Sequence, residues 1–98
     1  MKKIGKIADQ IKEEVEGAKC YAETYIELVL EGNSQWAQRY REMATQELTH
    51  ASWLHERASD MIQRLKTIYT PPQEMQEAWD ETHKKFVDMA NEVKDMIK

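Results

Sequence analysis

The segment that decides the fold covers residues 36–65 and reads WAQRYREMATQELTHASWLHERASDMIQRL. Its apolar residues recur every three or four positions, which is the period of an α-helix with one face packed against other helices. On a helical projection, Glu47 falls near the centre of this apolar face and His50 falls on its flank. Two polar residues therefore occupy positions where core residues are expected. The apolar face itself consists of Trp36, Tyr40, Met43, Ala44, Ala51, Leu54, Met61 and Leu65.

Glu47 and His50 are the first indication of chemistry. A carboxylate that faces a core without a partner costs several kcal/mol, so it takes up a proton, finds a partner or binds a cation. A Glu and a His three positions apart, both directed inward, form the half-site with which helical bundles hold iron or manganese. The pair predicts a metal site, and the competing interpretation is a metal-free buried polar pair that fixes helix register.

The composition is typical of one small helical domain. The 98 residues are 41% hydrophobic and 33% charged, with only 3 Gly and 2 Pro. The formal net charge is −4, and Lys and Arg are dispersed among the acids, which argues against a nucleic-acid surface and against a basic face for anionic lipid. No apolar run approaches membrane-spanning length. The sequence therefore predicts an all-α protein with no nucleic-acid or membrane partner.

Cys20 is the single cysteine, so the sequence offers neither an intrachain disulfide nor a Cys-x-x-Cys metal site. Residues 1–6 lead directly into an amphipathic pattern rather than into a hydrophobic signal region. A reducing, cytoplasmic location is therefore the expectation.

Three helical segments, at about 3–31, 35–68 and 72–97, account for nearly the whole of one domain over residues 1–98. At the first connection, Gly32 can adopt the left-handed backbone that ends a helix, and Ser34 can cap the next one. The second connection contains Pro71 and Pro72, and proline is favoured in the first turn of a helix. Because short connections make neighbouring helices antiparallel, we expect an up-down-up arrangement.

Glu14 is the third predicted ligand. It is the only charged member of a heptad seam in the first helical segment, whereas Glu13 and Glu16 point away from that seam. At a rise of about 1.5 Å per residue, Glu14 lies nearly level with His50 and within one turn of Glu47. Three suitable donors therefore converge between two helices; the alternative is a seam-edge Glu14 with its carboxylate in solvent. The seam comprises Ile4, Ile7, Ile11, Glu14, Ala18, Tyr21, Tyr25 and Leu28.

Four further residues are weaker candidates for the site: Tyr21, His55, Asp80 and His83. Tyr21 either donates a hydrogen bond to a metal-bound carboxylate or belongs to the core. Asp80 and His83 lie roughly 12 Å or more along the axis from the three donors, and His83 is closer in level to His55. Ordinary polar roles near helix boundaries are the favoured interpretation of both histidines; the alternatives are support of the site or an additional metal ion.

Trp53 lies outside the predicted apolar face of its helix. It either covers a neighbouring side chain or forms an oligomer contact, because exposed aromatic residues are enriched at interfaces.

Glu14 and Tyr21 on one helix, followed by Glu47-Leu48-Thr49-His50-Ala51 on the next, resemble the ferritin-like superfamily, most closely its rubrerythrin-type branch. The resemblance covers about residues 4–65. It implies a four-helix bundle in which two such halves hold two metal ions and carry out ferroxidase or peroxidase chemistry. It also implies that Glu14, Glu47 and His50 are ligands, with Glu47 as the carboxylate able to bridge the metals.

The sequence departs from this family pattern because it has no second Glu-x-x-His, no fourth helix and no rubredoxin domain. In this it is similar to the encapsulated ferritins, whose short subunits make the iron site across a dimer interface. We therefore expect a homo-oligomer, at least a dimer, whose two copies complete a four-helix core and share two iron ions, with manganese or zinc as alternatives. The competing functions are a metal-free structural or interaction module and a mononuclear zinc site in the monomer.

Overall fold

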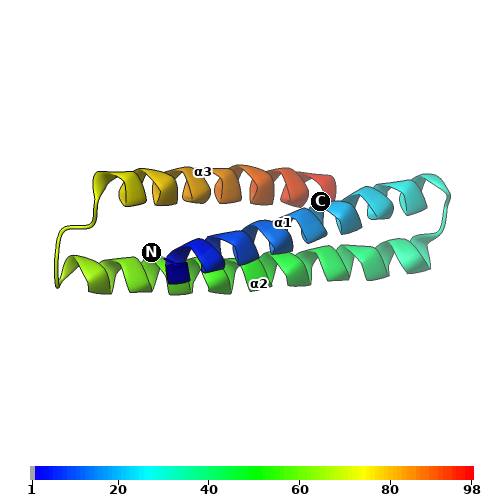
Figure 1. Ribbon diagram of the computed structural model, residues 1–98. Coiled ribbons are helices and arrows are strands. Elements are labelled where there is room, and N and C mark those ends of the chain that lie inside the picture. Colours follow the sequence, from blue (N-terminus) through cyan, green and yellow to red (C-terminus); the bar gives the residue numbers. More distant parts are fainter. Residues whose placement is uncertain (1) are drawn as a thin grey trace.

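The computed structural model describes residues 2–98 and consists of three α-helices in an up-down-up arrangement, with no strand in those residues (Figure 1). The helices are α1 (Lys2–Leu30), α2 (Ser34–Lys66) and α3 (Gln73–Met96). Their ends lie no more than two residues from those expected from the sequence. The predicted all-α, up-down-up fold is confirmed.

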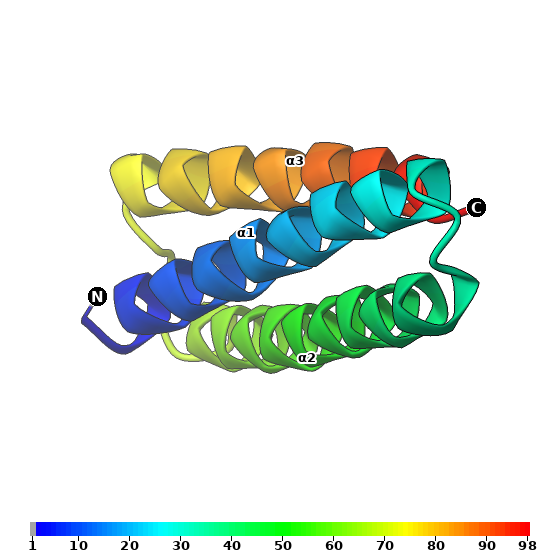
Figure 2. The same cartoon turned by 90° about the vertical axis from the view of Figure 1, so that its right-hand side faces the viewer.

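Helix α1 is the central element of an elongated molecule that measures 56 × 19 × 17 Å. It packs along α2 over most of its length, and α3 packs mainly against α1 (Figures 1 and 2). Contact between α2 and α3 is sparse. The third helix therefore depends on α1 and on a few long side chains for its position.

A row of alanines brings α1 and α2 close together. Ala37, Ala44, Ala51 and Ala58 are buried and recur every seven residues, so they lie along one side of α2. Because a methyl group occupies little space, the backbone of α1 can approach this row closely. Isoleucines of α1, among them Ile11, fill the space on either side.

The centre of the buried face of α2 differs from the predicted one. Leu48 and Ile62 are buried, whereas Trp36, which was expected in the core, is exposed in the first turn of α2. Glu47 therefore lies at the edge of the α1–α2 interface and not near its centre. The reason is that α1 packs on the alanine row, which lies to one side of the larger apolar residues used for the prediction.

The predicted seam of α1 is confirmed at Ile4, Ile7, Ile11 and Ala18, all of which are buried. Val15 and Ala22 are buried as well, because α1 is covered by α2 on one side and by α3 on another. Glu14 is only half-buried and lies beside this row.

The first connection turns at Gly32, whose φ of 77° is the left-handed backbone expected there. Asn33, and not the expected Ser34, caps α2: its side-chain oxygen accepts a hydrogen bond from the backbone N–H of Trp36 at 3.3 Å. At the second connection, Pro72 immediately precedes α3.

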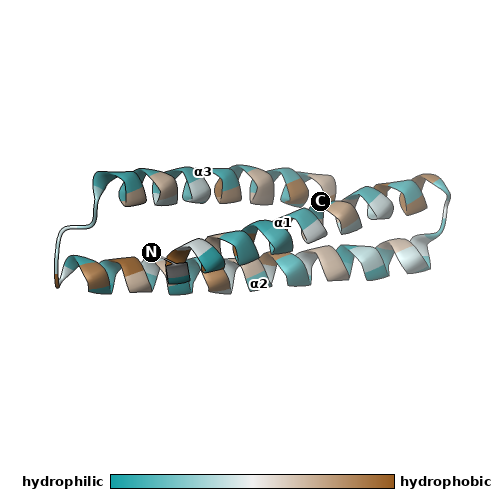
Figure 3. Ribbon diagram, viewed as in Figure 1, coloured by the Kyte–Doolittle hydropathy of each residue, from teal (hydrophilic) through white to brown (hydrophobic). Residues whose placement is uncertain are grey.

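Helix α3 presents a buried apolar face that includes Trp79, Ala90 and Val93. Arg41 Nε donates a hydrogen bond to the Ile97 carbonyl oxygen at 2.6 Å, which ties the end of α3 to α2. Apolar and hydrophilic residues are interspersed along all three helices (Figure 3). Within residues 2–98, no helix is long and apolar enough to cross a membrane.

Candidate metal centre

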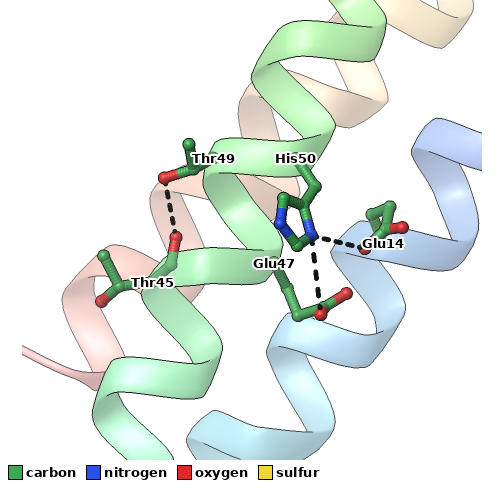
Figure 4. Close-up of polar contacts among 5 residues, drawn as sticks. All are labelled: Glu14, Thr45, Glu47, Thr49 and His50. Atoms are coloured by element: carbon green, nitrogen blue, oxygen red, sulfur yellow. Dashed lines mark hydrogen bonds and ion pairs between the residues drawn. The ribbon is translucent and has the colours of Figure 1, made fainter.

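Glu14, Glu47 and His50 come together between α1 and α2 (Figure 4). His50 Nδ1 lies 3.6 Å from Glu14 Oε2 and 3.8 Å from Glu47 Oε1. Each of the three residues offers one ligand atom, and these atoms all lie within 4.8 Å of one another. The structure therefore juxtaposes the three donors that the sequence predicts.

Two features of the local sequence produce this juxtaposition. Glu47 and His50 are one turn apart on α2 and project from the same side, whereas Thr49 between them turns away and donates to the Thr45 carbonyl (Figure 4). On α1, Gly17 lies opposite Glu47: a Cβ atom added there would be 3.6 Å from Glu47 Oε2. Nothing in the sequence pattern singles out Gly17, whose lack of a side chain leaves space beside the Glu47 carboxylate.

The site is open to solvent on one side. The side chains of Glu47, Glu14 and His50 are 26%, 31% and 47% exposed. Helix α3 lies behind α1 and α2 in this view, so it does not cover the three side chains (Figure 4). The cluster is therefore accessible both to ions in solution and to another protein chain.

The two carboxylates oppose each other electrostatically. A hydrogen bond with Glu14 is the main reason that the pKa of Glu47 is raised above its ordinary value; burial and the negative charge of Glu14 also raise it, and His50 opposes them. Carboxylates this close favour a proton or a cation between them. This is the electrostatic condition expected of a cation site.

We expect Glu47→Gln to stabilise the metal-free protein at neutral pH, by on the order of 1 kcal/mol. Because the pKa of Glu47 is raised, the folded chain binds more protons than the unfolded chain just above the ordinary pKa of 4.5. The stability of the wild type should therefore fall as pH rises through this window, and glutamine should abolish that fall. Urea unfolding with a chelator, at acidic and at neutral pH, measures both effects.

Glu13→Gln is the matched control for this prediction, because Glu13 is exposed and its replacement changes the net charge equally. A loss of more than about 3 kcal/mol in the metal-free Glu47→Gln protein would instead indicate a structural pair, since breaking such a pair leaves the other group unsatisfied.

The four weaker candidates lie outside this cluster. Tyr21 packs edge-on against Tyr40, with ring centroids 6.0 Å apart, and within residues 2–98 no hydrogen bond joins it to Glu14 or Glu47. Asp80 accepts a hydrogen bond from Gln76 at 2.9 Å on the exposed side of α3. His55 and His83 contact each other instead of the three donors.

Trp53 lies at the edge of the cluster. Its side chain is 63% exposed, as predicted from its place outside the apolar face. Its ring centroid is 5.9 Å from that of His50, three residues earlier on α2, so Trp53 contacts a neighbouring side chain, which is one of its two predicted roles. A large aromatic surface therefore lies uncovered directly beside the candidate ligands.

The donor set suits iron or manganese. Carboxylate oxygens favour hard divalent ions, and an imidazole nitrogen is a common ligand of iron and zinc. His50 Nδ1 lies within 4 Å of a carboxylate oxygen of Glu14 and of Glu47, and the two carboxylates interact with each other, so all three donors are in mutual contact. The residues present therefore fit a carboxylate-rich metal centre of the kind found in helical bundles.

Comparison with known proteins agrees with this geometry. The family model described as rubrerythrin matches residues 7–98, which include all three donors and all of α2 and α3. Searches of curated proteins and of solved structures gave no significant match. Since the family model covers nearly the whole chain, the protein belongs to the rubrerythrin family, within the ferritin-like superfamily.

Proposed function

We propose that two copies of this chain bind a pair of iron ions through Glu14, Glu47 and His50 of each copy, and that the bound iron reduces dioxygen or peroxide. The observation that carries the proposal is the convergence of three ligand atoms within 4.8 Å, on a face that α3 leaves open. Membership of the rubrerythrin family supports a metal-binding role for this cluster.

A second copy of the chain is the natural source of the remaining ligands. Two clusters related by a two-fold axis supply four carboxylates and two imidazoles, the donor set that ferritin-like bundles use for two ions. The exposed Trp53 beside His50 provides an apolar surface for such a contact. In this arrangement the metal site and the dimer interface are the same structure.

The chain's own residues hold and orient the reactants. Glu14 and Glu47 neutralise the positive charge of the ions, and His50 supplies a nitrogen ligand on the solvent side of the cluster. By the resemblance to rubrerythrin-type proteins, Glu47 would be the carboxylate able to bridge the two ions. When bound, two Fe(II) ions supply one electron each, and peroxide that accepts both electrons and two protons becomes two water molecules.

The test is oxidation of iron by the loaded protein. Wild-type protein is loaded anaerobically with Fe(II), peroxide or air is added, and the formation of Fe(III) is measured by near-ultraviolet absorbance. Fe(III) should form faster than in a sample with the same amounts of Fe(II) and of the Glu47→Ala variant. Equal rates in the two samples would contradict the redox function. Tight zinc binding by a strict monomer would favour the mononuclear alternative.

A further inference from the structure

A second polar cluster joins α2 to α3, away from the carboxylates. His55 Nε2 and His83 Nδ1 lie 2.6 Å apart and are hydrogen-bonded, so one of these nitrogens carries the hydrogen and the other accepts it. This is one of the few contacts between two helices that otherwise hardly touch. The facing nitrogens thus already share one positively polarised hydrogen between two lone pairs.

Aromatic rings hold His55 in place. Its ring stacks on Trp79, with centroids 5.2 Å apart and planes at 28°, and on Phe86, at 4.9 Å and 19°. His83 is exposed, so its side of the pair faces solvent. One imidazole is therefore preorganised by packing, and the other leaves space for additional ligands such as water.

We propose that His55 Nε2 and His83 Nδ1 form a second metal site, which takes a transition-metal ion that prefers nitrogen ligands, such as Cu²⁺ or Zn²⁺, in place of the shared hydrogen. The ring that carried this hydrogen then carries it on its other nitrogen, so that both facing nitrogens present a lone pair to the ion. Bonds of about 2.0–2.1 Å from each nitrogen to the ion require the two nitrogens to lie roughly 3 Å apart. The observed 2.6 Å needs only a small opening. The sparse contact between α2 and α3 permits it.

The chemistry of this pair differs from that of the carboxylate cluster. Two imidazoles favour copper, nickel and zinc, with copper bound most tightly, whereas two carboxylates and one imidazole suit iron and manganese. Burial, and to a smaller degree His83, lowers the pKa of His55, which favours the neutral ring that binds metals. An ion bound here would connect α3 to α2 across the gap that Trp79 and Phe86 now fill.

The test uses a full-length background variant, Glu47→Ala with His50→Ala, so that its outcome does not depend on the proposed iron site. Titrated with Cu²⁺, this background should bind one ion per chain, and its electron paramagnetic resonance spectrum should show two nitrogen ligands. Adding His83→Asn should weaken binding at least about tenfold and leave at most one nitrogen ligand. His83 is exposed, so this substitution leaves the core intact.

A second readout is thermal unfolding in Zn²⁺. The midpoint should rise for the background variant and stay constant once His83→Asn is added, because an ion that binds only the folded chain stabilises it. Equal Cu²⁺ affinity with and without His83, or a spectrum with fewer than two nitrogen ligands in the background variant, would overturn the proposal.

Discussion

Replacing Glu47 or His50 by alanine is expected to lower the affinity for Fe(II) by about tenfold to one-hundredfold. Both side chains contribute ligand atoms to the cluster, and Glu47 contacts each of the other two donors. Alanine removes the ligand without adding a group that could replace it. Elemental analysis after mild dialysis of anaerobically loaded protein measures the retained iron per chain.

Glu13→Ala is the matched control, since Glu13 is exposed and lies next to Glu14 in the sequence but outside the cluster. This variant should retain as much iron as the wild type. Equal iron in wild type and Glu47→Ala would show that the metal binds elsewhere or not at all, and would favour the metal-free structural module.

Fe(II) is also expected to drive dimer formation. A ligand that binds only the dimer stabilises it by mass action, and a free concentration 100 times the dissociation constant strengthens association by about one-hundredfold for each site. The open face of the cluster and the exposed Trp53 beside it are the surfaces that a second copy would cover. Light scattering at low micromolar protein, with and without Fe(II) under anaerobic conditions, measures this shift.

Two variants distinguish the contribution of the metal to dimer formation from that of the contact surface. Glu47→Ala should abolish the shift with Fe(II), and Trp53→Ala should weaken the dimer whether or not metal is present. Ile68→Ala is the control, because Ile68 is also a large exposed apolar residue but lies beyond the end of α2. A strict monomer that still holds iron tightly would defeat the shared site.

Much of the fold could be predicted because it depends on local signals. The helical period of apolar residues, the glycine at position 32 and the prolines at 71 and 72 define three helices and their connections. Glu14, Glu47 and His50 could be grouped because a regular rise along antiparallel helices fixes their level. The position of a residue along the helix axis can thus be predicted by counting residues from the connection between two helices.

The rotation of each helix about its own axis was harder to predict, because it depends on which residues are small enough to let two helices approach each other closely. The alanine row that includes Ala44 and Ala51 sets the α1–α2 contact, and it moves Glu47 from the expected centre of the interface to its edge. The space at Gly17 has no periodic signal, because it depends on side-chain positions between two helices. The ring contact between Trp53 and His50, in contrast, follows from their three-residue spacing on α2.

The contact between His55 and His83 was only partly accessible from the sequence. Their similar level along the bundle was visible, but α2 and α3 have few contacts, so level alone does not bring two side chains together. The pair meets because large aromatic side chains of α3, Trp79 and Phe86, span the gap and pack against the His55 ring.

Anomalous diffraction at the iron edge, from crystals loaded anaerobically with Fe(II), locates bound iron directly. It therefore tests whether a pair of metal ions is held by Glu14, Glu47 and His50 of two chains. Two anomalous peaks about 3.5–4 Å apart are expected between the clusters of two chains. A single peak within one chain, or no peak beside Glu47, would contradict the shared site.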